Sequence, residues 1–179
     1  MKKILSILFL IIMMAFTSLG RQNNSTEMLD WNSIRINNKL PLVCKKLDLI
    51  KLLGNPDKII NPEYLDICAS YFEKDFNYLV WGDCKFESTN SQAVISSVDI
   101  ESGIIKLVSP LITLDNSVTF EKIKRVFPNS AKYAKELIVE KKGTVLSIKL
   151  ASSRKNSDDG WLLFFKAGKL VRVDYWIAC

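Results

Sequence analysis

Two segments of this chain carry the same order of patterns, an amphipathic helix followed by short runs of aromatic and β-branched residues. In the first segment, Leu47, Ile50 and Leu53 recur at helical spacing, and the Gly-Asn-Pro that follows stops the helix. This spacing predicts a helix over 45–53. Strand-like runs follow at 66–73, 76–82, 93–100 and 104–108.

The second segment repeats this order. Phe120, Ile123 and Val126 form an apolar stripe, Thr119 is a suitable N-cap, and Pro128 ends the helix. Strand-like runs then cover 134–140, 144–151, 160–165 and 169–177, with Ala167-Gly168 as the last hairpin turn.

These patterns predict an α+β fold of two tandem helix-plus-antiparallel-sheet units, the first over 31–109 and the second over 110–179. The alternative is a coincidence between two ordinary α+β segments. Residues 21–30 are mostly polar and without periodicity, which predicts a flexible lead-in.

The first twenty residues have the order of an export signal. Lys2 and Lys3 precede an apolar run over 4–16, and small and polar residues follow it. The run is shorter than the roughly 20 residues that a membrane span needs. We expect cleavage near Arg21 and a periplasmic or secreted product; an uncleaved N-terminal anchor is the alternative. The first cysteine is Cys44, so none is placed to carry a lipid at the new N-terminus.

The charge is modest and scattered. The chain has 25 Lys and Arg against 19 Asp and Glu, and this excess of six falls to four without the two lysines of the signal. Such a balance argues against nucleic acid as a partner.

An even number of cysteines in an exported chain favours disulfides. The four are Cys44, Cys68, Cys84 and Cys179, and three pairings are possible. Cys68 opens one strand-like run and Cys84 closes the next, so a hairpin favours Cys68–Cys84, with Cys44–Cys179 as its complement. Strand register decides whether the first pair lies on one face.

The segment 47–57, Leu-Asp-Leu-Ile-Lys-Leu-Leu-Gly-Asn-Pro-Asp, resembles the helix-then-Gly-x-Pro segment of the small β-barrel assembly lipoproteins of the SmpA/OmlA type. The tandem arrangement and the closing hairpin over 161–170 are similar to the β-lactamase inhibitor protein family. The resemblance implies two repeats of one fold and a binding role. It does not extend to lactamase inhibition or to barrel assembly, because the chain lacks a lipid-anchor cysteine and Cys44 precedes the first helix.

The residue types do not favour catalysis. The sequence has no histidine, which removes the commonest general base and the usual zinc ligand. Two carboxylate pairs are the remaining candidates, Asp158 with Asp159 and Asp99 with Glu101, and turn or strand-end roles explain both more simply than catalysis does. The sequence has no phosphate-binding glycine loop, so we expect no cofactor, and the cysteine spacing predicts no metal site.

The aromatic residues are the one group in the sequence that is suited to binding another protein. Side chains alternate between the faces of a strand, so adjacent rings cannot all point toward the helices. Outward rings form a surface suited to a protein partner, unless a second layer covers them. The candidate binding residues are Tyr71, Tyr78, Trp81, Trp161, Phe164, Tyr175 and Trp176.

A basic cluster accompanies the second helix: Lys122, Lys124, Arg125, Lys132, Lys135, Lys141 and Lys142. A solvated helix face explains it more simply than an anionic partner. The sequence therefore predicts an exported, non-enzymatic protein-binding module, inhibitor-like or immunity-like. An envelope-assembly accessory protein and a carboxylate-dependent hydrolase are the alternatives.

Overall fold

The computed structural model describes residues 26–63, 67–153 and 158–179. The predicted signal peptide over 1–20 and residues 21–25 of the predicted lead-in lie outside these ranges. Within them, no helix combines the length and the apolar character that crossing a bilayer requires.

Short helices and antiparallel strands make up the fold, and strands form most of it. The helical elements are η1 (Trp31–Ser33), α2 (Lys46–Leu53), α3 (Phe120–Val126) and α4 (Pro128–Ala131). The strands are β1 (Arg35–Ile36), β2 (Leu40–Pro41), β3 (Val43–Lys45), β4 (Lys58–Ile60), β5 (Asn77–Trp81), β6 (Cys84–Ser88), β7 (Gln92–Asp99), β8 (Leu107–Val108), β9 (Thr113–Leu114), β10 (Lys135–Val139), β11 (Gly143–Ala151), β12 (Gly160–Lys166) and β13 (Lys169–Trp176).

A nine-stranded antiparallel sheet dominates the molecule. Its order is β10-β11-β12-β13-β7-β6-β5-β4, and β3 pairs with the start of β7 while β13 pairs with its end. A four-stranded sheet has the order β2-β1-β8-β9. The two predicted units therefore share one continuous sheet, joined where β7 meets β13.

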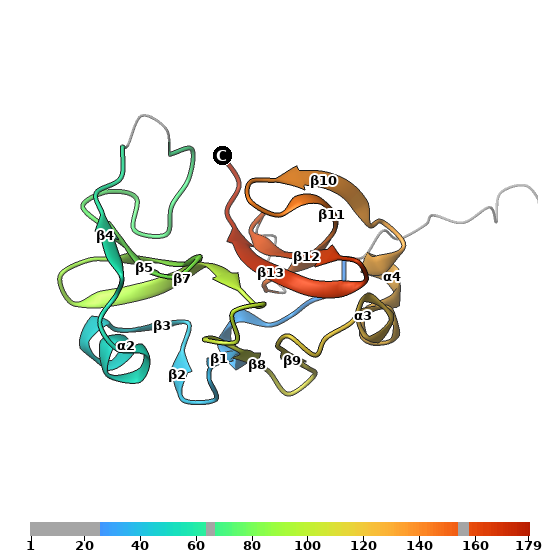
Figure 1. The fold of residues 1–179 in the computed structure, drawn as a ribbon, viewed down its shortest axis with the longest axis horizontal. Helices are drawn as coiled ribbons and strands as arrows, with labels where there is room; N and C mark the ends of the chain where they lie inside the picture. The colour runs from blue at the N-terminus through green and yellow to red at the C-terminus, as the bar shows by residue number, and fades with distance from the viewer. Residues whose placement is uncertain (1–25, 64–66, 154–157) are drawn as a thin grey trace, which may run out of the picture.

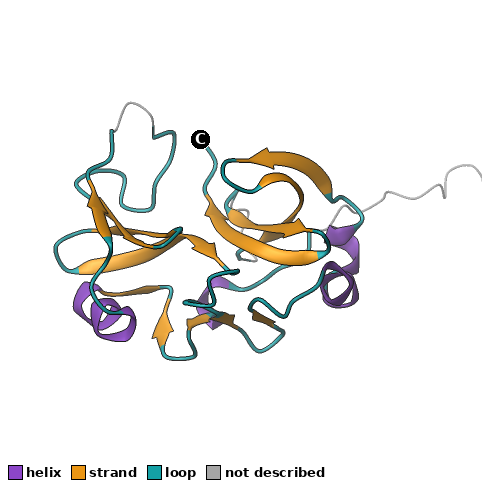
Figure 2. Cartoon of the chain, viewed as in Figure 1, coloured by secondary structure: helices purple, strands orange, loops and turns teal. Residues whose placement is uncertain are grey.

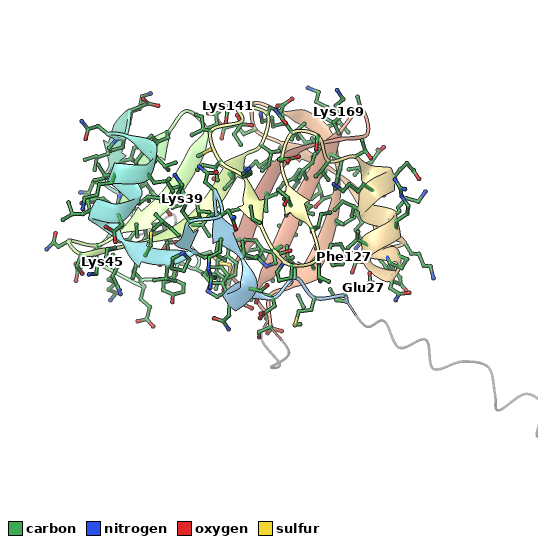
Figure 3. The ribbon with its side chains drawn as sticks, turned by 90° about the horizontal axis from the view of Figure 1, so that it is seen from below. Glu27, Lys39, Lys45, Phe127, Lys141 and Lys169 are labelled. Atoms are coloured by element: carbon green, nitrogen blue, oxygen red, sulfur yellow. A yellow bond between two sulfur atoms is a disulfide. The ribbon has the colours of Figure 1, made fainter. Side chains whose placement is uncertain are left out.

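A layer of helices and short strands covers one face of the large sheet. In Figures 1 and 2, α2, α3 and the four-stranded sheet all lie below the large sheet. Figure 3, seen from below, shows α2 and α3 at opposite ends of this layer. We call the opposite side, which points up in Figure 1, the upper face. Residues 67–76, which precede β5, and strand β10 rise above its two ends (Figure 1).

The hydrophobic core lies between the large sheet and the layer below it. A single cluster of buried side chains includes Leu49 of α2, Ile123 of α3 and Ile36 of the smaller sheet. It also includes Phe86 and Leu163, which come from the two halves of the large sheet. The halves are thus packed on a common core.

Both predicted helices are confirmed. Helix α2 buries Leu49 and ends at Gly54, whose φ of 85° is readily available only to glycine. Helix α3 begins at Thr119, whose hydroxyl accepts a hydrogen bond from the backbone N–H of Lys122 at 3.2 Å.

The first turns of the two helices are held in corresponding ways. The backbone N–H of Lys46 donates to the carbonyl of Ser91 at 2.9 Å, and that of Phe120 donates to the carbonyl of Gly168 at 2.8 Å. Each acceptor directly precedes the last strand of the meander that follows its helix, β7 or β13.

The four strands predicted for the second segment are confirmed as β10 to β13. The predicted turn between the last two is confirmed as well. Ala167 and Gly168 both have positive φ, at 48° and 76°. Positive φ at both central residues is the requirement of a type I′ hairpin.

The strand predicted over 66–73 is wrong within its described residues. Residues 67–73 form an irregular segment, and Glu73 has a φ of 59°. The backbone N–H groups of Tyr71 and Phe72 donate to the carboxylate of Glu87 at 2.8 and 3.2 Å. A side chain thus satisfies donors that a strand partner would otherwise bind.

The prediction of a flexible lead-in over 21–30 is wrong for the last residues of this segment. Leu29 is only 1% exposed, and its backbone N–H donates to the carbonyl of Ala151. The carboxylate of Glu27 accepts from the backbone N–H of Ser130 at 2.9 Å, while the N–H of Glu27 donates to the hydroxyl of Ser130. These contacts join the segment to the second half.

The preferred cysteine pairing is also wrong. The disulfide joins Cys68 to Cys179, and Cys44 and Cys84 are buried free thiols. The Cys68–Cys84 bond was predicted for a hairpin whose first strand does not form. Instead Cys84 lies at the start of β6 and is buried in the core, with its Sγ 3.7 Å from the carbonyl oxygen of Asp99.

Candidate functional site: the upper face of the large sheet

Strand register places two rows of side chains across the upper face. Residues directly opposite in neighbouring strands point to the same face of a sheet. The first row crosses seven strands, from β11 to β4: Lys149, Leu162, Asp174, Ser97, Lys85, Val80 and Lys58. The second runs from β10 to β7: Lys135, Ser147, Phe164, Arg172 and Asp99. The upper face is therefore largely polar, in contrast to the apolar side that packs on the core.

A charged groove lies where the two halves meet, with a volume of about 490 Å³. Strands β5, β6, β7 and β13 contribute to it, and the turn between β10 and β11 closes one side. Five basic side chains line the groove: Lys58, Lys85, Lys141, Lys142 and Arg172. Four acidic side chains, Asp57, Asp83, Asp99 and Glu140, also line it.

Ion pairs from the β10–β11 turn hold the two halves together across this groove. Lys142 Nζ lies 2.8 Å from Asp99 Oδ1 and 2.6 Å from Glu101 Oε2. The side chains of Lys142 and Asp99 are each only 12% exposed. Lys141 makes a second pair, 2.8 Å from Asp83 Oδ1, which is largely open to solvent. Burial thus fixes the positions of Lys142 and Asp99 within the groove.

These contacts shift the ionisation of the groove. Burial acts to lower the pKa of Lys142, but the hydrogen bonds to Asp99 and Glu101 outweigh it and raise this pKa. The hydrogen bond from Lys141 lowers the pKa of Asp83. Both shifts favour the charged forms.

On β13, burial has the opposite effect. Burial raises the pKa of Asp174, although Arg172 opposes this through a 2.6 Å hydrogen bond from its Nε. Asp174 therefore holds its proton more tightly than an ordinary aspartate does.

A second hollow, of about 310 Å³, lies on the same face, at the end formed by β10, β11, β12 and α4. Lys135, Ser147, Lys149 and Leu162 of the two rows line it, together with Leu137. Val145, Phe164 and Val171 form a small buried apolar cluster, against which Leu162 packs. This hollow has apolar walls where the groove has charged ones.

Two of the predicted binding residues are core residues. Trp81 is 3% exposed and Trp161 is fully buried. The indole N–H of Trp81 donates to the carbonyl of Gly54 at 3.1 Å, and that of Trp161 donates to the carbonyl of Leu29 at 2.9 Å. The prediction that these two rings line an open surface is wrong, because the layer below the sheet covers them.

Phe164 is buried too, at 4% exposure, within the small apolar cluster of the upper face. Tyr78 is half-buried in β5, and Lys85 Nζ lies 4.7 Å from the centre of its ring. The covering layer therefore buries two of the seven rings, Trp81 and Trp161, and neighbouring side chains of the upper face bury Phe164.

The remaining aromatic candidates lie toward the C-terminal end of β13. Tyr175 is half-buried, and its hydroxyl donates to the carboxylate of Asp159. Its ring centre is 4.1 Å from that of Trp31, which stacks in turn on Tyr71 at 6.2 Å. Tyr71 is 42% exposed and Trp176 36%. Of the predicted rings, these two are the ones most available to a partner.

The carboxylate pairs predicted as catalytic alternatives have structural partners. Asp99 and Glu101 share the ammonium of Lys142. Asp159 accepts hydrogen bonds from Ser152 and Tyr175, and the backbone carbonyl of Asp158 accepts from Lys149. Among the described residues, no group of three or more Cys, Asp and Glu is arranged to hold a metal ion.

The predicted basic cluster is divided by the fold. Lys124 pairs with Glu121 on the exposed side of α3, as a solvated helix face requires. Lys141 and Lys142 belong to the charged groove, and Lys135 belongs to the second hollow.

The sequence analysis did not identify Lys85, Ser97 and Arg172, which line the groove, or Asp174, which accepts a hydrogen bond from Arg172. A signal for two of them is present in β13, where Arg172 and Asp174 alternate with buried valines. Such alternation marks the polar side of a strand. The register that joins β13 to β7 has no comparable local signal.

Comparison with models of known protein families, with curated proteins and with solved structures finds no match.

Proposed function

We propose that this protein is a non-enzymatic protein-binding module and that its upper face contacts the partner. The observation that carries the proposal is the charged groove. Its position where β7 and β13 meet combines side chains of both halves, and partly buried ion pairs fix their positions before a partner arrives. Preorganised charges favour specific protein association, since little side-chain entropy is lost on binding.

Aromatic side chains at the edge of this face support the same role. Tyr71 and Trp176 are both partly exposed, and Trp and Tyr are enriched among the residues that dominate binding energy. Trp176 is held in place by Lys149, whose Nζ lies 3.7 Å from the ring centre.

We propose further that the protein works outside the cytoplasm, in the periplasm or after secretion. The Cys68–Cys179 disulfide supports this compartment, because disulfides persist in oxidising surroundings. The charge-apolar-small order of the first twenty residues supports it independently.

The two halves are proposed to be tandem copies of one unit, as in the β-lactamase inhibitor protein fold. Each half has a helix and then a four-stranded antiparallel meander, β4 to β7 or β10 to β13. The matching hydrogen bonds of Lys46 and Phe120 support the proposal. The last strands of the two meanders pair with each other, and the groove lies at this junction of the two halves.

The other functions considered receive less support. A carboxylate-dependent hydrolase needs a free acid and base, whereas Asp99 and Glu101 are engaged by the same lysine. A role as an accessory of envelope assembly is a special case of partner binding and uses the same face.

Charge reversal at the groove tests the proposed role. Lys58 is exposed on β4 and lines the groove, so Lys58→Glu leaves the core intact. Lys122→Glu, on an exposed position of α3, is the matched control. Proteins of an envelope extract that the wild type retains are quantified for each variant. We expect the Lys58→Glu variant to lose at least about tenfold in affinity, equal to about 1.4 kcal/mol. Equal loss in both variants, or in neither, contradicts binding at the upper face.

A further inference from the structure

The second hollow of the upper face differs from the groove in its charge. Among the eight described residues that line it, the charged ones are Lys135 and Lys149, and none is acidic. In the groove, by contrast, five basic side chains have four acidic neighbours. The hollow therefore differs from the groove because its charged lining residues are all basic.

The two lysines lie close to each other by register. Lys135 of β10 is directly opposite Ser147 of β11, and Lys149 follows two residues later on the same face of β11. Diagonal neighbours of this kind are about 7–8 Å apart at the backbone, within reach of long side chains. The backbone spacing is therefore short enough for both side chains to reach a single anion in the hollow that they line.

The position of Lys149 is fixed. Its Nζ donates to the backbone carbonyl of Asp158 at 3.1 Å and lies 3.7 Å from the ring centre of Trp176. An ammonium with one carbonyl and one ring as neighbours keeps further donor capacity, because it carries three N–H groups.

Ser147 lies between the lysines and the apolar floor. It is only 5% exposed and it lines the hollow. A serine hydroxyl both donates and accepts hydrogen bonds. This hydroxyl can therefore bind a polar ligand atom in the hollow.

The walls of the hollow are apolar. Leu162 forms part of them and packs on the buried cluster that contains Phe164, while Leu137 contributes from β10. Leu137 is 42% exposed, so an apolar ligand here removes a side chain from water. The volume of about 310 Å³ is at the lower end of small-molecule sites, which run from about 300 to 1,000 Å³.

We propose that this hollow binds a monoanionic amphiphile, an apolar chain that ends in a carboxylate. The chain contacts the leucines, and the carboxylate accepts hydrogen bonds from Lys135, Lys149 and the hydroxyl of Ser147. Two sources supply this chemistry, a free medium-chain carboxylic acid or the apolar C-terminal residue of a peptide. The inference does not depend on the partner-binding role of the groove.

Calorimetric titration of the full chain with four probes tests the proposal. Decanoate and decylamine share one apolar chain and differ in the sign of the head group. A short peptide ending in Leu-Phe with a free carboxylate is compared with its amide. We expect decanoate to bind at least roughly tenfold more tightly than decylamine, because charge-assisted hydrogen bonds stabilise the carboxylate. Tighter binding of the acid peptide than of decanoate assigns the source to a peptide terminus, and the reverse order assigns it to a free acid.

Variants locate the binding in the hollow. Lys135→Met and Lys149→Met keep the length of the side chain and remove its charge, and each is expected to weaken decanoate binding by roughly three- to tenfold. Lys169→Met is the control, since Lys169 is exposed at the start of β13 and does not line the hollow. Ser147→Leu fills the hollow and is expected to abolish binding. Equal affinity for decanoate and decylamine, no binding of either acid probe, or unchanged affinity in both lysine variants overturns the proposal.

Discussion

Replacement of Trp161 tests most sharply how the aromatic residues are used. Trp161 has no exposed surface, stacks on Trp31 with ring centres 5.3 Å apart, and donates an indole hydrogen bond to the carbonyl of Leu29. Trp161→Ala removes this packing, and losses of about 3–5 kcal/mol are usual for a buried tryptophan. Trp161→Phe keeps most of the ring and leaves the Leu29 carbonyl without its partner, at a cost of about 1–3 kcal/mol.

Urea unfolding followed by circular dichroism gives the free energy of unfolding for each variant. Trp176→Ala is the matched control, because this ring is 36% exposed and its contact with Lys149 contributes about 1 kcal/mol or less. We expect the loss of stability to be largest in Trp161→Ala, smaller in Trp161→Phe and smallest in the control Trp176→Ala. A Trp161→Ala variant as stable as the wild type refutes the assignment of this residue to the core.

Three further predictions concern charge and covalent structure. Burial raises the pKa of the Glu87 carboxyl above its usual 4.5, so the folded protein binds the carboxyl proton more tightly than the unfolded chain does. Stability therefore falls as the pH rises above 4.5. Glu87→Gln is expected to flatten this part of the curve of stability against pH. Lys142→Met leaves two carboxylates without their shared cation and is expected to cost about 3 kcal/mol in urea unfolding, whereas Lys141→Met, at an exposed pair, changes little. The double variant Cys68→Ser and Cys179→Ser opens a link across a sequence separation of 111 residues and is expected to lose about 2–5 kcal/mol.

Each of these predictions has a contrary result. An unchanged pH profile in the Gln variant contradicts the role of burial at Glu87. Equal losses in the two lysine variants contradict the distinction between the partly buried and the exposed pair. Four thiols that react with an alkylating reagent in the native protein contradict the disulfide and also the burial of Cys44 and Cys84, whose thiol pKa values burial raises to about 11.

Local chemistry explains why the second half was predictable from the sequence. Thr119 as N-cap, Pro128 as helix stop and the Ala167-Gly168 turn each act within a few residues. The alternation of Leu146, Ile148 and Leu150 with polar residues likewise follows from the two-residue period of a strand. Features of this kind need no knowledge of the rest of the fold.

The first half was less predictable because its structure depends on distant contacts. The segment around Tyr71 has the composition of a strand, but the carboxylate of Glu87 and the bond from Cys68 to Cys179 hold it as a loop. The strands of the smaller sheet have two residues each, too few for a periodic pattern.

The candidate site was also hard to predict, because it too depends on contacts between residues that are far apart in the sequence. Adjacent aromatic residues correctly indicate that some rings face away from the core, but they do not tell which ones. The covered rings Trp81 and Trp161 are as aromatic as the exposed Trp176. The groove depends on the pairing of Arg172 with Asp99 and of Asp174 with Ser97, which are far apart in the sequence.

Site-specific photo-cross-linking tests the central claim, that the upper face contacts a protein partner. A photoreactive amino acid is placed at Lys58, which lines the groove, or at Tyr71, which is exposed at the edge of the upper face. The control position is Leu47 of α2, which is 69% exposed on the opposite side of the sheet. We expect the same partner to be cross-linked from Lys58 and Tyr71 and not from Leu47. A partner cross-linked from Leu47 alone would contradict it.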